Sequence, residues 1–113
     1  MHEYNPEDIE VKEVPVGRDM MLLVTGGSAH IGAVSTAYKD SSGRIEVQTT
    51  ALPGHKEHTI SEGLAIKAAR ALDRTVTVAA GIHYDHISLE QIKTIVAIVN
   101  ERMDEYLQRV AQP

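Results

Sequence analysis

The sequence predicts an α+β domain, in which an antiparallel sheet of about five strands is covered by two helices. Four apolar or β-branched segments precede the first helical pattern and a fifth separates it from the second, so the order is β-β-β-β-α-β-α. The length of 113 residues is typical of one domain. We therefore expect residues 1–113 to form a single domain with a mobile segment at residues 1–8, and the small size favours a homodimer.

Two hairpins and one further strand are expected. Residues 9–16 alternate in polarity, residues 20–24 are apolar, and a Gly-Arg-Asp turn joins them into the first hairpin. Residues 30–38 and 45–50 predict a second hairpin around an Asp-Ser-Ser-Gly turn. Residues 75–80 are rich in β-branched side chains and too few for a helix, which indicates a buried strand.

The first helix is predicted over residues 59–72. Thr59 and Glu62 have the spacing of a capping box, in which each side chain bonds a backbone N–H of the first helical turn. Apolar residues then recur every four positions along one face: Ile60, Leu64, Ala68 and Leu72.

The second helix is predicted to begin after Ser88. Ser88 and Gln91 form another capping box, and Ile87 and Ile92 stand at the positions of a hydrophobic staple across it. An apolar stripe follows over about five turns: Ile92, Ile95, Val96, Val99, Met103, Tyr106 and Val110. Such a stripe faces the core in most proteins, and in a short chain it can also form a subunit contact.

The composition excludes several classes of function. The absence of Cys excludes disulfides, thiolate catalysis, zinc fingers and iron-sulfur clusters. The net charge of -5 without a basic cluster argues against a nucleic-acid partner. We expect a cytoplasmic protein without membrane contact, because neither a signal-peptide pattern nor a membrane-spanning apolar stretch is present. The unusual feature is six His, five of which lie between His30 and His86.

Most of these His fall in three segments at residues 25–32, 53–58 and 81–86. Consecutive elements with short connections run back and forth, so the predicted element order places all three segments and both helix N-termini at one end of the sheet. That end would hold His30, His55, Lys56, Glu57, His83 and Asp85. Such an environment suits an anion, a divalent cation or a metal-bound phosphate.

Two His residues stand two positions before a carboxylate. In an extended segment, His55 with Glu57 and His83 with Asp85 would project to the same side, as two metal ligands or as a His with its orienting carboxylate. The alternative is that these polar residues occupy solvated loops. The candidate metal ligands are His30, His55, Glu57, His83 and Asp85, a nitrogen and oxygen set that suits zinc, manganese, iron or nickel.

Gly26 and Gly27 could bring backbone N–H groups close to a phosphate. The stronger alternative is a turn that needs a positive φ. The segment matches neither a dinucleotide-binding fingerprint nor a P-loop, and the chain contains no Gly-x-Ser-x-Gly nucleophile motif, so no catalytic residue is predicted.

The same segments resemble a known family. They read Thr25-Gly26-Gly27 with His30-Ile31-Gly32-Ala33-Val34, Pro53-Gly54-His55-Lys56-Glu57, and Ala80-Gly81-Ile82-His83-Tyr84-Asp85. In this order they are similar to the LpdD-like prenylated-flavin chaperones, the small D subunits of gallate-type decarboxylases. The resemblance implies an α+β dimer, with a fold like that of proteasome assembly chaperones. It also implies a protein that binds prenylated FMN or FMN and supports a UbiD-type decarboxylase without catalysing decarboxylation.

The resemblance carries over to particular residues. It implies that the cofactor phosphate or a divalent metal is contacted by His30, His55, Lys56, Glu57, His83 and Asp85, and the cofactor-binding set also includes Gly26 and Gly27. The chain departs from the family pattern at His58, where an acidic residue is frequent, and at His86, where Asn is frequent. Two other functions remain open, an assembly-chaperone-like protein-interaction dimer and a small metal-dependent hydrolase or isomerase.

Overall fold

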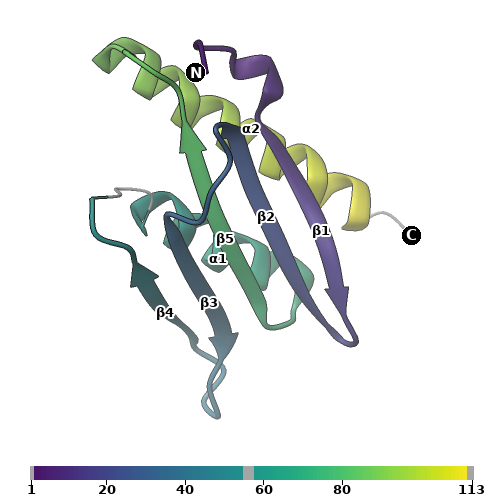
Figure 1. The fold of residues 1–113 in the computed structure, drawn as a ribbon. Coiled ribbons are helices and arrows are strands. Elements are labelled where there is room, and N and C mark those ends of the chain that lie inside the picture. Colours follow the sequence, from purple (N-terminus) through teal and green to yellow (C-terminus); the bar gives the residue numbers. More distant parts are fainter. Residues whose placement is uncertain (1, 55–57, 112–113) are drawn as a thin grey trace.

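The computed structural model describes residues 2–54 and 58–111, which form a mixed sheet, two α-helices and a short 3-10 helix (Figure 1). The elements are η1 (Pro6–Asp8), β1 (Glu10–Val16), β2 (Asp19–Gly27), β3 (Ala33–Lys39), β4 (Ile45–Ala51), α1 (His58–Leu72), β5 (Val76–His83) and α2 (Leu89–Ala111). The α+β class and the order β-β-β-β-α-β-α are therefore confirmed.

The sheet is mixed, so the prediction of an antiparallel sheet is wrong in this respect. The strand order is β1-β2-β5-β3-β4, and β5 lies between the two predicted hairpins. It pairs antiparallel with β3 and parallel with β2. The reason is that α1 returns the chain to the starting end of β4 before β5 begins, so β5 runs in the direction of β4 and β2. Both hairpins are confirmed as antiparallel pairs.

Two predicted strand bounds change because of this insertion. The first strand of the second hairpin begins at Ala33 rather than at residue 30, since the chain between β2 and β3 must first cross β5. β5 continues beyond residue 80 to His83, because its last residues pair with the end of β2, where Gly27 faces His83.

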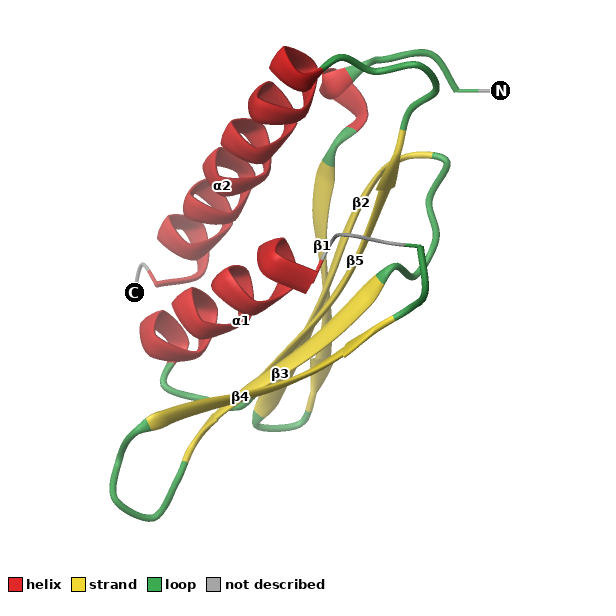
Figure 2. Ribbon diagram, turned by 90° about the vertical axis from the view of Figure 1, so that its left-hand side faces the viewer, coloured by secondary structure: helices red, strands yellow, loops and turns green. Residues whose placement is uncertain are grey.

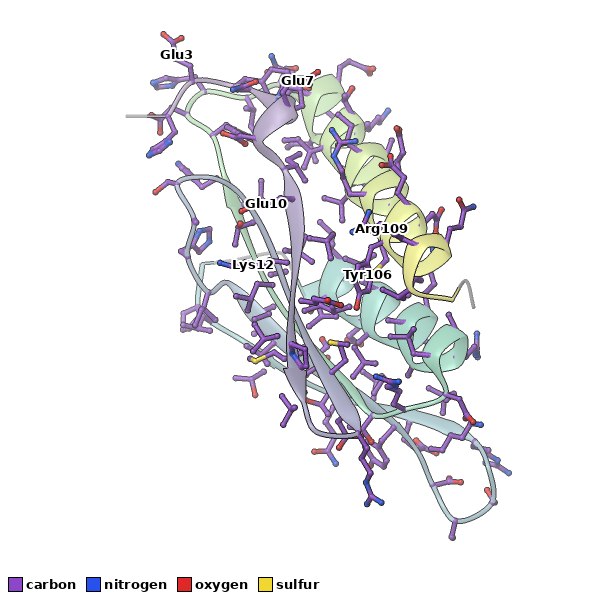
Figure 3. The ribbon with its side chains drawn as sticks, turned by 90° about the vertical axis from the view of Figure 1, so that its right-hand side faces the viewer. Glu3, Glu7, Glu10, Lys12, Tyr106 and Arg109 are labelled. Carbon is purple, nitrogen blue, oxygen red and sulfur yellow. The ribbon has the colours of Figure 1, made fainter. Side chains whose placement is uncertain are left out.

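Both helices cover the same face of the sheet (Figure 2). Leu22 and Val24 on β2 and Val76 and Val78 on β5 point into the layer between sheet and helices and are fully buried. On the other face, Glu10 and Lys12 of β1 point away from the helices, whereas Tyr106 of α2 lies on the helix side (Figure 3). The core is mostly aliphatic, as expected for a chain without Phe or Trp, and Tyr84 and Tyr106 are its buried aromatic residues.

The start of α2 has the predicted capping box. The Ser88 N–H donates to the Gln91 side-chain carbonyl at 2.8 Å, and the Gln91 N–H donates to the Ser88 hydroxyl at 3.1 Å. The predicted stripe is only partly buried: its buried members are Ile95, Val99, Met103 and Tyr106, and its exposed members are Ile92, Val96 and Val110. The stripe therefore turns out of the core at both ends of the helix.

The first helix starts one residue earlier than predicted. α1 already includes His58, so Thr59 lies inside the first turn and does not hold the N-cap position expected from the sequence. Of the helices in the described residues, neither is long and apolar enough to cross a membrane.

Candidate functional site

The end of the sheet at which β2 and β5 finish is where the segments at residues 25–32 and 81–86 meet. Gly27 pairs with His83 across the two parallel strands, and the Gly32 N–H donates to the Ala80 carbonyl at 2.9 Å. The Leu52 N–H donates to the Gly32 carbonyl at 2.9 Å, which brings the end of β4 to the same place. The chain order thus brings these segments together as predicted, while His55, Lys56 and Glu57 lie outside the described residues.

His30 lies in the loop that crosses β5. A Cβ atom at Gly81 would overlap the His30 carbonyl oxygen, so the loop rests directly on the strand. Its position is held by further bonds, since the Ser28 N–H donates to the His83 carbonyl at 2.9 Å and the His30 Nδ1 lies 2.9 Å from the Ser28 carbonyl oxygen. His30 and His83 therefore come from adjoining segments linked through Ser28.

The pair His83 and Asp85 forms as one of the alternatives anticipated. The Nε2 of His83 lies 3.2 Å from a carboxylate oxygen of Asp85, which is the arrangement of a His with its orienting carboxylate. The His2 N–H donates to the Asp85 carboxylate at 3.0 Å, and the Asp85 N–H donates to the His2 carbonyl at 2.8 Å. The hydrogen bond from the His2 N–H, which has the largest effect, and the hydrogen bond with the His83 ring lower the pKa of the Asp85 carboxyl. Asp85 is therefore ionised at neutral pH.

The two glycines serve close packing within the chain. A Cβ at Gly26 would come within 2.8 Å of the Tyr84 hydroxyl, and Gly27 has a φ of +64°. The Gly27 N–H donates to the Asp8 carboxylate at 3.0 Å. Gly27 therefore adopts the positive-φ turn that the sequence favours over a phosphate loop, and its N–H is already bonded within the protein. Cofactor contact by Gly26 and Gly27 stays a prediction.

The sequence predicts a mobile segment at residues 1–8 and no role for Tyr84. Tyr84 is 2% exposed, and its hydroxyl contacts the Asn5 carbonyl at 2.9 Å and the Asp8 carboxylate. The Tyr4 ring packs edge-on against Tyr84 with centroids 5.6 Å apart. Burial, together with the Asp8 carboxylate, raises the pKa of the Tyr84 phenol. Only the position of Tyr84, an aromatic residue directly after a buried strand, could have indicated this packing.

The described residues do not by themselves complete a metal centre. Within residues 2–54 and 58–111, no three His, Asp or Glu side chains come together in a way that could hold a metal ion. His83 and Asp85 supply two potential ligands. Metal binding by the predicted set His30, His55, Glu57, His83 and Asp85 stays a prediction.

His86, one of the two departures from the family pattern, has a backbone φ of 54°. This is the left-handed region, where Asn, the residue frequent at this position of the family, is well tolerated.

An apolar pocket opens at the same end, on the helix side of the sheet. Its volume is about 160 Å³, and it is lined by Ile60, Ile82, Tyr84, Ile87, Ile92, Ile95 and Val96. A second hollow of about 380 Å³ lies along α1 and α2 and shares Ile60, Ile92 and Val96 with the first. The sequence signal for this pocket is the pair Ile87 and Ile92, whose positions also predict the hydrophobic staple of α2.

Comparison with known proteins gives two results. Residues 3–111 match the family described as "Prenylated flavin chaperone LpdD-like domain". The chain is also similar to "Protein LpdD" of Lactiplantibacillus plantarum, with 32% identity over 92 residues that cover 76% of this chain and 65% of that protein. The aligned part of this chain thus spans just under two thirds of the relative's length.

Proposed function

The chain belongs to the LpdD-like prenylated-flavin chaperone family, and from this membership we propose that it binds prenylated FMN and supports a UbiD-type decarboxylase without catalysing a reaction itself. The observation that carries the proposal is the family match over residues 3–111. The meeting of two of the three family-like segments at one end of the sheet supports it, because it offers a single place for a ligand.

The cofactor phosphate is proposed to bind at this end of the sheet. Both α1 and α2 begin here, and the N-terminus of a helix favours a negative charge. Lys56, His55, His30 and His83 would contact the phosphate, either directly or through a divalent metal. His83 and Asp85 fit a metal as two of its ligands, because a nitrogen and a carboxylate oxygen face each other there.

A chaperone role requires that the ligand is held and then released to a client. The His83 and Asp85 side chains are 58% and 32% exposed, so a ligand bound there would be open to exchange with a client enzyme. The client is proposed to be a UbiD-type decarboxylase in the cytoplasm. The uncovered sheet face, with Val14 and Val16 exposed on its edge strand β1, is the surface proposed for a homodimer.

The second candidate function is a protein-interaction dimer whose polar end has no ligand. The exposed apolar side chains Val16 and Ile31, at 56% and 59%, favour a protein contact near the sheet. A metal-dependent hydrolase or isomerase ranks third, since it needs a dry pocket around an open metal position and a chain with only four aromatic residues has limited means to enclose one.

The proposal is tested by titrating reduced prenylated FMN into the protein and into His83→Ala, with His86→Ala as the matched control from the same loop. We expect His83→Ala to weaken binding at least about tenfold, because an anion or metal contact is lost. His86→Ala should bind as the unmodified protein does. Equal affinity in all three proteins would remove His83 from the site, and partner binding that survives in His83→Ala without any flavin binding would favour the interaction module.

A further inference from the structure

We infer that the pocket between the N-terminal turns of α1 and α2 holds the prenyl-derived carbons of the cofactor, with the flavin rings along the adjoining hollow. This inference rests on the proposed function and adds to it the place where the prenylated form is distinguished from FMN. No residue of this pocket belongs to the sites predicted from the sequence.

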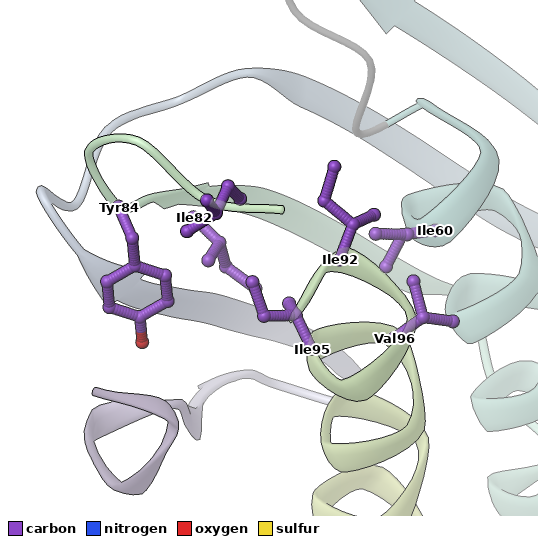
Figure 4. A pocket seen from close by; sticks show the side chains of 7 residues that line it. Ile60, Ile82, Tyr84, Ile92, Ile95 and Val96 are labelled. Carbon is purple, nitrogen blue, oxygen red and sulfur yellow. The ribbon is translucent and has the colours of Figure 1, made fainter. Parts of the chain in front are cut away.

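The side chains of the pocket wall are almost entirely hydrocarbon. Ile60 comes from α1, Ile82 from β5, and Ile92, Ile95 and Val96 from α2, with Tyr84 at one end (Figure 4). The only polar side-chain group among the lining residues is the Tyr84 hydroxyl, which is bonded to Asn5 and Asp8 of the N-terminal segment. The pocket therefore offers no polar partner from its side chains and selects an apolar group.

The size of the pocket suits one isoprenoid unit. An apolar cavity of about 150 Å³ in another protein accepts a six-carbon ring such as benzene, and this pocket measures about 160 Å³. The pocket adjoins the hollow of about 380 Å³, with which it shares three lining residues, so the two lie side by side around Ile60, Ile92 and Val96. Together they reach the size range of small-molecule sites.

The adjoining hollow has room and polarity for a ring system. Gly63 lies on it, and a Cβ there would meet no atom within 4 Å, so the wall is open at this point. Thr59 and Asn100 add a hydroxyl and an amide at its border. The amide of Asn100 donates to the Val96 carbonyl at 2.9 Å, which leaves its oxygen able to accept a hydrogen bond.

Two large apolar side chains stay open to solvent at this site in the chain alone. Ile92 is 44% and Val96 is 37% exposed, although the periodicity of α2 places both on its apolar stripe. Covering them with a hydrocarbon ligand removes apolar surface from water, and each buried CH2 group raises affinity by about fourfold. The prenylated form should therefore bind at least about tenfold more tightly than reduced FMN.

The test measures dissociation constants of reduced prenylated FMN and reduced FMN for the unmodified protein and for two pocket variants. Ile92→Asn places a polar group in the wall, and Val96→Phe fills the space. Val110→Asn is the matched control, because Val110 is 38% exposed on the same helix and does not line the pocket. Thermal melting of each variant verifies that it is folded. If one pocket variant does not fold, the other is sufficient for the test.

We expect each pocket variant to lose at least about tenfold in affinity for the prenylated form and a smaller factor for FMN, whose rings would meet Ile92 and Val96 only from the adjoining hollow. The control should match the unmodified protein. If the unmodified protein binds prenylated FMN but both folded pocket variants bind it equally well, the pocket assignment is overturned and the proposed function stands. Equal affinity of the unmodified protein for the two flavins also overturns the assignment. Absence of binding to the unmodified protein overturns both.

Discussion

The backbone carbonyl of His30 rests on the α-carbon of Gly81, at the point where the chain between β2 and β3 crosses β5. Any side chain at residue 81 would occupy the position of this carbonyl. The crossing is required by the strand order, because β5 lies between β2 and β3. A glycine at this position therefore lets the His30 loop pack against the strand and brings His30 beside the segment that carries His83.

Replacement of Gly81 by Ala is expected to destabilise the fold by about 3 kcal/mol, because the crossing loop must move away from the strand. Chemical denaturation of the purified variant measures this free energy of unfolding. Gly63→Ala is the control: no atom lies within 4 Å of the new Cβ, and Ala in a helix should add about 1 kcal/mol of stability. A Gly81→Ala protein as stable as the unmodified one would contradict the packing described.

Replacement of Tyr84 by Phe is expected to loosen the segment before β1. The variant leaves the Asp8 carboxylate and the Asn5 carbonyl without their phenol donor, at a cost of about 2 kcal/mol for a bond to a charged group. Hydrogen exchange of the Asp8 and Ile9 amides, which bond within the η1 turn, should become about tenfold faster. Tyr38→Phe serves as control, and equal exchange in both variants would show that the phenol does not hold the segment.

The stability of the protein should fall at alkaline pH through Tyr106. Its hydroxyl donates to Glu13 at 2.7 Å, and burial together with this carboxylate raises the pKa of Tyr106 above its ordinary value of 10.0. Because the pKa of Tyr106 is higher in the folded than in the unfolded chain, the unfolded chain ionises first as the pH rises. The contribution of Tyr106 to the free energy of unfolding is therefore complete below pH 10 and is lost as the pH rises above 10. The free energy of unfolding of Tyr106→Phe should decline less steeply above pH 10 than that of the unmodified protein, and identical slopes would contradict this account.

Divalent metal binding, if the predicted ligands act together, should depend on Asp85. Asp85→Asn removes the carboxylate that faces His83 and should lower the affinity for zinc or manganese by about 10- to 100-fold. Asp104→Asn, which changes an exposed residue of α2 that pairs with Lys67 of α1, should leave the metal affinity unchanged. Calorimetric titration of each metal measures the constants, and equal metal affinity in the two variants would remove Asp85 from the ligand set.

Local patterns predicted most elements, because they depend on neighbours in the chain. The capping box at Ser88 and both hairpins formed as the spacing indicated. The insertion of β5 could not be predicted in this way, since it depends on which strand edge is free when α1 returns the chain. The antiparallel expectation failed there, although the alternation of strand direction still brought two of the three unusual segments to one end.

The candidate site was predictable only in part. The pairing of His83 with Asp85 follows from their spacing in an extended segment. At the same end of the sheet, Asp8 bonds Tyr84 and His2 bonds Asp85, across 76 and 83 positions of the chain. No local pattern in the sequence predicts contacts at such separations. The apolar pocket arises where two helices and a strand end diverge, so it depends on packing that the stripe of α2 does not encode by itself.

The measurement that tests the central claim most directly is retention of reduced prenylated FMN by the purified protein. The protein is mixed with the reduced cofactor under anaerobic conditions, with and without a divalent metal, and separated from free flavin by gel filtration. We predict that the flavin co-elutes with the protein in a fixed proportion. Elution of all the flavin as free cofactor under both conditions would contradict the proposed chaperone function.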